Sequence, residues 1–440
     1  MPVEALSTAV ITIGASEAYS SASEAIAVKA LAELYAGAPS PGEVLREGAR
    51  PLRVMLLAPE QSVYQRFCAR DMNEAFASLG AETMTCLIKH GHSWRLEFLD
   101  LVGQHRPDAL FVFSQRRRNL PELPRELAVL GWDQDCVCGF DSGGIWRIGP
   151  RDRIWTLMDE WREQMDANGV ESNVVGHLNM GANTNLYYPP NEDVEYEHEV
   201  LFVGNIHPFE QYLKMVQFEN WPKAAQSIML HARDRLFEWI RTRDEHEPFV
   251  IPEIEMFLLE SADAIGVTVS TEMAQWATMV RFFRYRIAHY VVRERMIESL
   301  SGFRLGLYGH GWDRFPSLAP YAKPAINNGP EMLRVMHRSA VHVQLHTWTV
   351  HHPRLYDTAA AGGYLLVGRV PERRPLELEF EVGQELDSFG SIAELHKKIR
   401  HALDHPDMMR SMGARAAERV LREHTMTHSA SQVLEELQRD

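Results

Sequence analysis

HHPRLYDTAAAGGYLLV, residues 351–367, predicts a short helix with an abrupt end, followed by a buried strand. Pro353 suits the first helical position, because its φ angle is fixed and its missing N–H group would have no partner there. Gly362 suits the position just after the helix, where φ turns positive. Arg354 and Asp357 are three residues apart and therefore share one helix face. An arginine at the start of a helix favours a phosphate-binding site.

The length and charge of the chain narrow the possible classes of protein. With 440 residues, it is about three times as long as a typical domain, so two α/β domains with additional helices would fit. Its 45 Lys and Arg residues against 60 Asp and Glu residues give a formal charge of −15. Such an acidic chain argues against a general nucleic-acid or anionic-membrane binder, although it permits a local basic cleft for a phosphorylated ligand.

Cysteine content and targeting signals indicate the compartment. The four cysteines include no Cys-x-x-Cys pair, which suits a reducing environment. The first residues carry Glu4 and no basic cluster, so we expect no secretory signal. No run of about 18 apolar residues occurs, so we expect no membrane-spanning segment and a cytoplasmic location.

The chain divides into four segments. Residues 1–50 predict an N-terminal helical extension, with a Pro- and Gly-rich linker at 38–42. Residues 51–190 alternate short apolar runs with amphipathic ones, which predicts a first doubly wound, Rossmann-like α/β domain. Residues 191–425 resume this alternation in a second such domain, and residues 426–440 predict a C-terminal helix.

The apolar runs define the strands that we expect. In the first domain they are 52–58, 83–88, 109–113, 136–140 and 174–178, with helices at 63–78, 94–103, 120–130 and 151–168. In the second domain they are 200–203, 303–308, 341–345 and 365–367. Residues 209–300 have helical character, so we expect a helical insertion in the second domain.

The end of this insertion, residues 273–300, mixes aromatic residues with arginines. A helix of this kind would either present a basic face to a groove or expose solvated arginines on an ordinary surface. We favour the second interpretation. The arginines concerned are Arg281, Arg284, Arg286, Arg293 and Arg295.

Four strand ends in the second domain carry glycine or polar residues where a ligand would bind. In doubly wound sheets ligands bind beyond the carboxyl ends of the strands, and glycine there allows a backbone to approach closely. Tight strand-to-helix turns would explain any one of these ends, but four in one domain favour a binding site. The candidate binding residues are Gly204, Asn205, Tyr308, Gly309, His310, Gly311, Trp312, His346, His352, Arg354, Asp357, Gly362 and Gly363.

Arg354 and Asp357 are the strongest candidates for contact with a ligand. The arginine can neutralise a diphosphate, helped by the helix N-terminus, and the carboxylate can accept hydrogen bonds from ribose or sugar hydroxyls. The alternative is a local helix ion pair, which contributes only about 0.3–0.5 kcal/mol. We favour ligand contact because of the surrounding glycines.

Other kinds of site lack support in the sequence. His342 and His346 would lie about 13 Å apart on a strand, too far to share a metal ion, and no His-Glu-x-x-His motif occurs, so we expect no metal site. The serine-hydrolase elbow Gly-x-Ser-x-Gly and the P-loop motif are both absent. The first strand is not followed by Gly-x-Gly-x-x-Gly, which argues against a nicotinamide dehydrogenase.

Six segments between roughly residues 180 and 435 occur in a recognisable order. They are NTNLYYP (183–189), VLFVGN (200–205), LYGHGW (307–312), RLYDTAAAGGYLL (354–366), FEVGQEL (380–386) and the helix 414–425 that ends in REHT. This ordered set resembles the CgeB-like (spore maturation protein) glycosyltransferases of the GT-B fold.

The resemblance implies a two-domain, hexosyltransferase-like GT-B enzyme without a cofactor or a catalytic metal. Its second domain would hold a nucleotide-diphosphate sugar as co-substrate. Arg354 and the helix start would stabilise the departing diphosphate, and Asp357 would take the place of a Glu that contacts the donor ribose. His310 and Trp312 would line the nucleotide or sugar.

The resemblance places the acceptor, a glycan, protein or small molecule, on the first domain. The acceptor would contact the loops that follow the first-domain strands, at Glu60, Gln61 and Ser114. Asp141, in the loop after 136–140, and Glu60 are the candidates for a catalytic base.

The chain departs from the pattern of the family at two points. Many such enzymes have a Glu-x7-Glu element, whose earlier position is Thr349 here and whose later position is Asp357. An Arg and Lys pair that usually follows the first strand of the donor domain is replaced by GNIHP at 204–208. These departures keep a second hypothesis open, a GT-B-shaped protein without transfer activity that binds a nucleotide or a protein partner.

Overall fold

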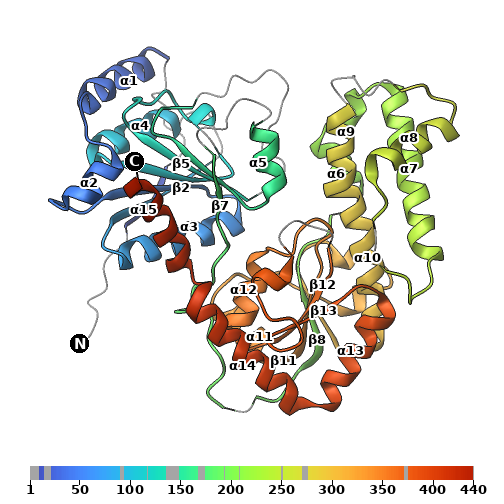
Figure 1. Ribbon diagram of the computed structural model, residues 1–440. Coiled ribbons are helices and arrows are strands. Elements are labelled where there is room, and N and C mark those ends of the chain that lie inside the picture. Colours follow the sequence, from blue (N-terminus) through green and yellow to red (C-terminus); the bar gives the residue numbers. More distant parts are fainter. Residues whose placement is uncertain are drawn as a thin grey trace. The chain divides into compact units, whose positions relative to one another are not determined.

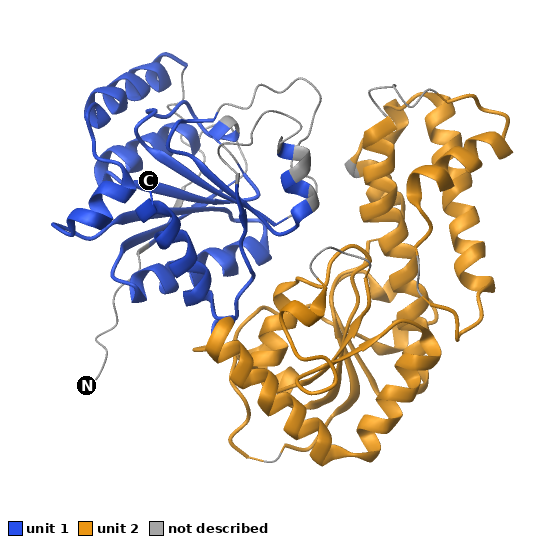
Figure 2. Ribbon diagram, in the orientation of Figure 1, with its two compact units in different colours: residues 1–183, 424–440 blue, residues 184–423 orange. Residues whose placement is uncertain are grey.

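The structure, a computed structural model, falls into two compact units, which Figure 2 distinguishes by colour. Unit 1 comprises Met1–Asn183 and His424–Asp440, and unit 2 comprises Thr184–Glu423. The chain therefore leaves unit 1 and returns to it at its end. The residues that the structure describes are 9–13, 21–89, 94–115, 117–134, 148–166, 174–192, 194–207, 209–248, 251–269, 276–370 and 375–439.

Unit 1 is built on a parallel sheet, in which the described residues form seven strands in the order β1-β3-β2-β4-β5-β6-β7. Strand β4 is buried along its whole length, as is usual where both faces of a parallel sheet are covered. The chain order reverses between β2 and β4, which marks the switch point of a doubly wound sheet. The bounds are β1 (Ala9–Ile13), β2 (Arg53–Pro59), β3 (Glu82–Ile88), β4 (Ala109–Phe113), β5 (Ala128–Asp133), β6 (Arg153–Thr156) and β7 (Val174–His177).

Helices cover both faces of this sheet (Figure 1). The ring of Phe76 on α3 lies 5.5 Å from that of Phe111 on β4. Val112 points to the opposite face and joins a core with residues of α1 and α4, such as Leu31 and Phe98. The helices of unit 1 are α1 (Ser21–Tyr35), α2 (Pro41–Glu47), α3 (Val63–Ser78), α4 (Trp94–His105), α5 (Asp159–Asp166) and α15 (Met426–Arg439), with a short 3₁₀ turn at Arg117–Asn119.

The segment 1–50 was predicted as a helical extension, and its described residues contribute to the body of unit 1. Strand β1 pairs with β3 at the edge of the sheet, and α1 packs against α4. The expected linker at 38–42 contains the start of α2, where Ser40 caps the helix and Pro41 occupies its first turn. Helix α15 packs against α2 and α3, so both ends of the chain belong to unit 1.

Of the helices predicted in the first domain, 120–130 is wrong and 151–168 is correct only in its second half. Strand β5 begins inside the first, and β6 lies inside the second, where α5 is the helical part of the described residues. Both strands are almost wholly buried, and a continuous buried run has no period that distinguishes a strand from a helix. The predicted strand at 136–140 lies outside the described residues.

Unit 2 contains a second parallel sheet, in which the described residues form six strands in the order β10-β9-β8-β11-β12-β13. The chain order reverses between β8 and β11, so this sheet is also doubly wound. The predicted α/β fold class with two Rossmann-like domains is therefore confirmed. The bounds are β8 (His198–Val203), β9 (Leu305–Tyr308), β10 (Ala322–Lys323), β11 (Ser339–Gln344), β12 (Tyr364–Gly368) and β13 (Asp387–Phe389).

Helices occupy most of residues 209–300 and share their core with the sheet. Met229, Leu236 and Phe283 of these helices belong to one buried cluster with Val200 and Val341 of the sheet. The elements are α6 (Phe209–Met215), α7 (Lys223–Thr242), α8 (Ile254–Ala264), α9 (Trp276–Phe282), a π-helical segment (Phe283–Ala288) and α10 (His289–Ser299). The remaining helices of unit 2 are α11 (Pro330–His337), α12 (Pro353–Ala360), α13 (Ile392–Asp404) and α14 (Pro406–Glu423), with 3₁₀ turns at Phe218–Asn220, Leu300–Gly302, Trp312–Arg314, Ala319–Tyr321 and Leu376–Leu378.

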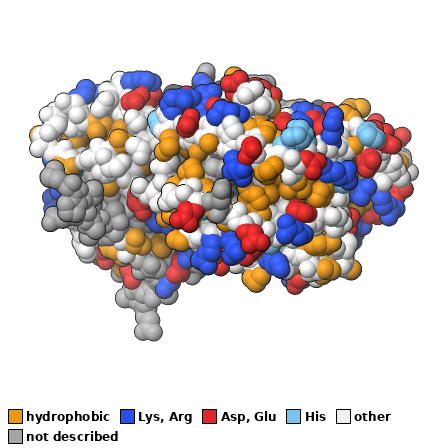
Figure 3. All heavy atoms as spheres, turned by 90° about the horizontal axis from the view of Figure 1, so that it is seen from below, with side chains coloured by type: hydrophobic (Ala, Val, Ile, Leu, Met, Phe, Trp, Pro, Cys, Tyr) orange, Lys and Arg blue, Asp and Glu red, His pale blue; other side chains and the backbone are white. Residues whose placement is uncertain are grey.

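Charges of both signs are mixed at the surface. Figure 3 shows basic and acidic side chains interspersed on one face of the molecule. Exposed ion pairs such as Arg410 with Asp407 are of this kind. None of the described helices combines the length and the apolar character needed to cross a bilayer.

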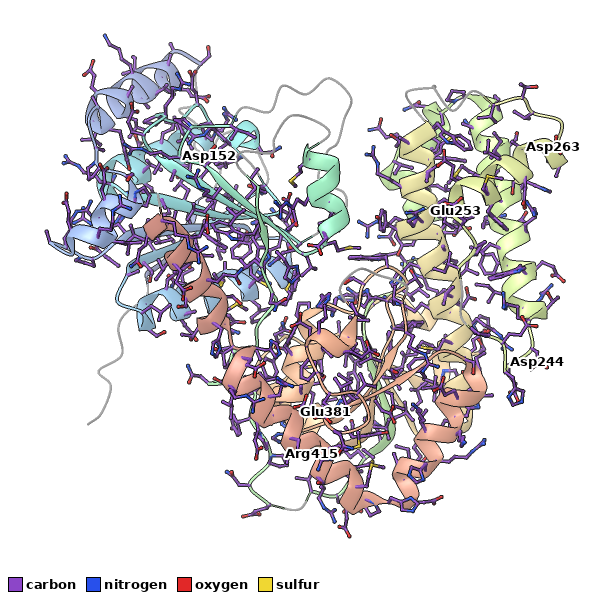
Figure 4. All side chains as sticks on the ribbon, viewed as in Figure 1. Asp152, Asp244, Glu253, Asp263, Glu381 and Arg415 are labelled. Carbon is purple, nitrogen blue, oxygen red and sulfur yellow. The ribbon has the colours of Figure 1, made fainter. Side chains whose placement is uncertain are left out.

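Asp152, labelled in Figure 4, is a buried charge that ties the segment before β6 to its neighbours. Its carboxylate accepts hydrogen bonds from Arg117 Nη2 at 2.7 Å and from the N–H groups of Val129 at 2.9 Å and Gly149 at 2.7 Å. The Arg117 side chain is 10% exposed. Both charges of this ion pair are therefore largely removed from water.

We expect Asp152→Ala to lower the free energy of unfolding by about 3–5 kcal/mol, because it leaves the buried Arg117 guanidinium without its counter-charge. Urea unfolding followed by tryptophan fluorescence measures the loss. Asp407→Ala is the matched control, since its ion pair with Arg410 is exposed and contributes little. Equal effects of the two substitutions would contradict this role of Asp152.

Candidate functional site

The candidate site lies at the carboxyl edge of the unit 2 sheet, where β8 and β11 are neighbours. Because the chain order reverses between these strands, the segments that follow them border the crevice in which doubly wound sheets bind ligands. Strand β9 pairs with β8 on its other side, so the segment after β9 joins the same edge. Helix α12 begins after β11 and brings its first turn there as well.

Hydrogen bonds hold the segments after β8 and β9 together. The N–H of Gly204 donates to the carbonyl of Tyr308 at 2.9 Å, and the N–H of Ile206 donates to the carbonyl of His310 at 2.9 Å. The side-chain oxygen of Asn205 accepts from the N–H of His310 at 2.9 Å. Asn205 therefore fixes the shape of the paired loops.

Two glycines allow these loops to approach. A Cβ atom on Gly309 would lie 2.2 Å from the carbonyl oxygen of Gly204, and one on Gly311 would lie 1.9 Å from that of Ile206. Both glycines also have positive φ angles, 138° and 93°. The loop contact at this edge thus depends on the absence of side chains at these positions.

The first backbone donors of α12 are already occupied. His352 caps the helix, and its Nδ1 accepts from the N–H of Arg354 at 3.2 Å. The N–H of Leu355 donates to the carbonyl of His352 at 2.8 Å, and Pro353 has no N–H. A phosphate at this end of the helix would therefore be bound mainly by side chains, with support from the helix dipole.

The Arg354 side chain, 20% exposed, retains donors without an acceptor. Its Nη2 donates to the Oδ1 of Asn328 at 3.3 Å, and its Nη1 lies 3.6 Å from the Oδ2 of the buried Asp357. Nε and Nη1 have no hydrogen-bond partner among the described residues. Because an unsatisfied buried donor costs about 1–3 kcal/mol, this guanidinium suits a further acceptor.

Three imidazole rings stack beside Arg354. The ring centroids of His346 and His352 are 4.2 Å apart, and those of His289 and His346 are 5.2 Å apart. Burial, reinforced by nearby cations, lowers the pKa of all three side chains, to about 3 for His352. The rings are therefore neutral at pH 7. Since Nδ1 of His352 accepts a hydrogen bond, its proton lies on Nε2, which can donate to a ligand.

A metal site is not evident in this cluster. No group of three or more His, Cys, Asp or Glu side chains that could hold a metal ion occurs in the described part of the chain.

Arg293 of α10 is a buried cation at the same edge. The expectation that the arginines of residues 273–300 are solvated is therefore wrong for this residue. Arg293 as a whole residue is only 8% exposed. Nη1 donates to the carbonyl of Asn205 at 2.7 Å, and Nη2 donates to that of Leu345 at 3.4 Å. Burial lowers its pKa to about 10. The aromatic, arginine-rich sequence of this helix was the only signal, and it did not show which arginine faces the sheet.

Most of the predicted binding residues come together at this edge. Two of them point elsewhere. The hydroxyl of Tyr308 lies 3.2 Å from Nε2 of His198, the first residue of β8, so the phenol folds back toward the amino edge. Trp312 is fully buried and donates its indole N–H to the carbonyl of Gly204 at 2.6 Å, so it supports the loop from the core. The residues that come together are Gly204, Asn205, Gly309, His310, Gly311, His346, His352, Arg354 and Asp357.

Gly362 and Gly363, also predicted to bind the ligand, lie at the opposite end of α12. They precede the start of β12, at the amino edge of the sheet, because the helix carries the chain back across it. A Cβ atom on Gly413 of α14 would lie 2.0 Å from the carbonyl oxygen of Gly362. Gly362 itself has a positive φ angle of 72°, and a Cβ atom on Gly363 would lie 2.8 Å from Nε2 of His342, so the local backbone and packing require glycine at both positions.

The predicted acceptor-side residues of unit 1 also meet at one sheet edge. Glu60 and Gln61 follow β2, and Ser114 follows the neighbouring β4 with a φ angle of 49°. The Oγ of Ser114 accepts from the N–H of Gln134 at 3.2 Å. Asp141 lies outside the described residues.

Sequence reasoning missed three buried polar residues at this edge, Asp133, Gln134 and Thr156. Asp133 ends β5 and lies in register with Thr156 at the end of β6. Both amide atoms of Gln134 and the hydroxyl of Thr156 have no hydrogen-bond partner among the described residues. The ends of β5 and β6 would have indicated these residues, had the two strands not been predicted as helices.

Part of the chain matches a protein family. Residues 292–435 match the model of the family described as Glycosyl transferase-like (Glyco_trans_1_2). This segment includes Arg293, Arg354 and all strands of the second sheet except β8. This part of the chain is therefore similar to glycosyltransferase-like proteins, in agreement with the predicted class of enzyme. No curated protein matches the chain in sequence.

Several solved structures are similar to this chain at low identity. A glycosyltransferase from Rickettsia africae ESF-5 is 8% identical, with 88% of this chain and 98% of that chain covered and a TM-score of 0.45. The catalytic domain of starch synthase IV from Arabidopsis thaliana, bound to ADP and acarbose, is 10% identical, with 89% and 99% covered and a TM-score of 0.45. Sucrose-phosphate synthase from Thermosynechococcus elongatus is 11% identical, with 87% and 97% covered and a TM-score of 0.43.

We expect Gly311→Ala to destabilise the protein by about 1–3 kcal/mol, because the added methyl group would overlap the carbonyl of Ile206 at a positive φ angle. Denaturant unfolding measures the change. Gly302→Ala is the control, since a Cβ atom there meets no atom within 4 Å. If both variants unfold at the same denaturant concentration, the loop contact does not require this glycine.

Because these histidines are buried, we expect the free energy of unfolding to fall as the pH is lowered. The pKa of His352 is about 3 in the folded state, against 6.5 without the burial, so the unfolded chain binds more protons between these values. Stability therefore rises with pH in this range, and His352 alone should account for a loss of about 2 kcal/mol between pH 7 and pH 5. Urea unfolding at both pH values measures the loss. The difference should shrink in His352→Gln, and an unchanged difference would speak against this assignment.

Proposed function

We propose that the protein is a glycosyltransferase that moves a sugar from a nucleotide-diphosphate sugar to an acceptor. The observation that carries the proposal is Arg354, whose unsatisfied donors lie at the start of α12 and at the switch point of a doubly wound sheet. The family match over residues 292–435 supports it, because that segment contains Arg354. We further propose a CgeB-like enzyme, on the strength of the ordered sequence segments.

Arg354 and His352 would act on the leaving group. As the bond between the sugar carbon and the diphosphate oxygen breaks, negative charge develops on the diphosphate. The Nε and Nη1 hydrogens of Arg354 and the Nε2–H of the neutral His352 would donate to it, and the dipole of α12 would add to the effect. Since these donors are positioned before binding, we propose that the leaving group is stabilised without a metal ion.

Asp357 would serve the donor in two ways. Its carboxylate is buried and lies 3.6 Å from Nη1 of Arg354, so it orients the guanidinium. We propose that it also accepts a hydrogen bond from a ribose hydroxyl of the donor, the role that the resemblance implies.

We propose that the acceptor binds at the carboxyl edge of the unit 1 sheet. Glu60, Gln61 and Ser114 come together there, at the ends of adjacent strands. Glu60 would take the proton from the acceptor hydroxyl as the glycosidic bond forms. A glycan, a protein and a small molecule all fit this description of the acceptor, and the formal charge of −15 argues against nucleic acid. A cytoplasmic location is part of the same proposal.

A second candidate function is nucleotide or partner binding without sugar transfer. Thr349 favours it. This residue is fully buried, and its Oγ1 accepts from the N–H of His351 at 3.0 Å, where the resemblance would place a catalytic-site Glu. Its hydroxyl thus stabilises the loop before α12.

Thermal unfolding with a panel of nucleoside diphosphates, followed by donor-hydrolysis assays, separates the two functions. A ligand at 100 times its dissociation constant should stabilise the protein by about 2.7 kcal/mol. Stabilisation with turnover supports the transferase. Binding without turnover favours the second function, and no stabilisation by any nucleotide would exclude the first.

We expect Arg354→Ala to weaken nucleoside diphosphate binding at least about tenfold, because it removes the charged donors for the diphosphate. Isothermal titration calorimetry measures the affinity, and circular dichroism establishes that the variant is folded. Arg422→Ala is the control, since Arg422 is exposed and pairs with Glu423. Unchanged affinity in Arg354→Ala would refute the phosphate role.

A further inference from the structure

Arg293 brings a second cation to the edge that carries Arg354, from a distant part of the chain. It lies on α10, at the end of the helical block 209–300. Its Nη1 donates to the carbonyl of Asn205, after β8, and its Nη2 donates to that of Leu345, after β11. Because β8 and β11 border the switch point, the guanidinium spans the place where a ligand would enter.

Among the residues that the structure describes, this buried cation has no carboxylate partner. No carboxylate is among the groups that act on the charge of Arg293, and its Nε has no hydrogen-bond partner among the described residues. The carbonyls of Asn205 and Leu345 accept hydrogen bonds from its two terminal nitrogens, but they carry no net charge that could balance the cation. Since a buried cation without a counter-charge is unfavourable, a bound anion would stabilise this arrangement.

The stacked imidazoles connect Arg293 with Arg354. His352 is influenced by the charges of both arginines, and His346, stacked on it at 4.2 Å, is influenced by Arg293. On the side of β8, Gly204 has no side chain, and a Cβ atom there would lie 3.6 Å from Nη1 of Arg293. Two cations and two neutral imidazoles therefore line one continuous part of the edge.

We propose that Arg293 is a second contact for the diphosphate of the donor, with one phosphate toward Arg354 and the other toward Arg293. This inference rests on the proposed function. As the bond to the sugar carbon breaks, the charge that develops on the diphosphate is shared by the two guanidinium groups. The helical block thus supplies a residue of the donor site.

Inorganic pyrophosphate is the probe, because it carries both phosphates without a base or a sugar. Calorimetric titration of the full chain compares the wild type with Arg293→Met, Arg293→Lys and Arg284→Met. Arg284 is the matched control, since it lies in the same helical block but is exposed and pairs with Glu253, which Figure 4 labels. We expect the affinity to fall about tenfold or more in Arg293→Met, to recover only in part in Arg293→Lys and to stay unchanged in the control.

The outcomes separate this inference from the function on which it rests. An affinity for pyrophosphate that is unchanged in Arg293→Met overturns it, and so does a wild type that binds no pyrophosphate. If Arg293→Met does not fold, Arg293→Lys decides, because it keeps the charge but cannot reach both carbonyls as the guanidinium does. In Arg293→Lys, an affinity for pyrophosphate below that of the wild type, with Arg284→Met unchanged, supports the inference, and an affinity equal to that of the wild type overturns it. Pyrophosphate binding that depends on Arg293, without binding of any nucleoside diphosphate, would refute the proposed function alone.

Discussion

The parallel pairing of β8 with β11, at the point where the chain order reverses, is the constraint on which the rest of unit 2 depends. It brings the segments after β8, β9 and β11 to one edge of the sheet. The first two of these segments can meet only because Gly309 and Gly311 lack side chains. Asn205 and Trp312 then hold them in place by hydrogen bonds to the backbone of His310 and Gly204. The edge is therefore a rigid frame, and its chemistry lies in the few side chains that reach it.

Local sequence features were enough to predict some of the residues at this edge. The positions of the others depend on packing between segments that are far apart in the sequence. Arg354 could be predicted because a proline and a nearby glycine delimit its helix. The same reasoning placed Gly362 at the edge, although a helix carries the chain back to the opposite side within two turns. Tyr308 was assigned from its position at a strand end, which does not show that its phenol folds back. Arg293 could not be singled out, because its burial depends on strands far away in the sequence. Strands β5 and β6 were not recognised because they are buried almost throughout. Their sequences therefore lack the alternation of apolar and polar residues that identifies a half-buried strand.

The arginines and histidines at the edge have different roles. Burial keeps the imidazoles of His289, His346 and His352 neutral, so they contribute hydrogen bonds and no net charge. The positive charge comes from the guanidinium groups of Arg293 and Arg354, and guanidinium groups in general carry their charge independently of pH in the physiological range. An anion held by these groups would therefore experience a nearly constant field between pH 6 and pH 8. A cluster whose charge came from histidine would lose it over the same range.

The helical block 209–300 and the carboxyl edge of the unit 2 sheet depend on the same core. Side chains of α7, the π-helical segment and α10 pack with those of β8 and β11 in a single cluster, and this packing determines where Arg293 lies. The guanidinium is also 5.5 Å from the ring of Phe202 on β8, so a cation–π contact and two carbonyls partly offset its burial. A bound anion would supply the missing charge. In sequence the block resembles an insertion beside a complete α/β domain, whereas in the structure the edge of that domain is incomplete without it.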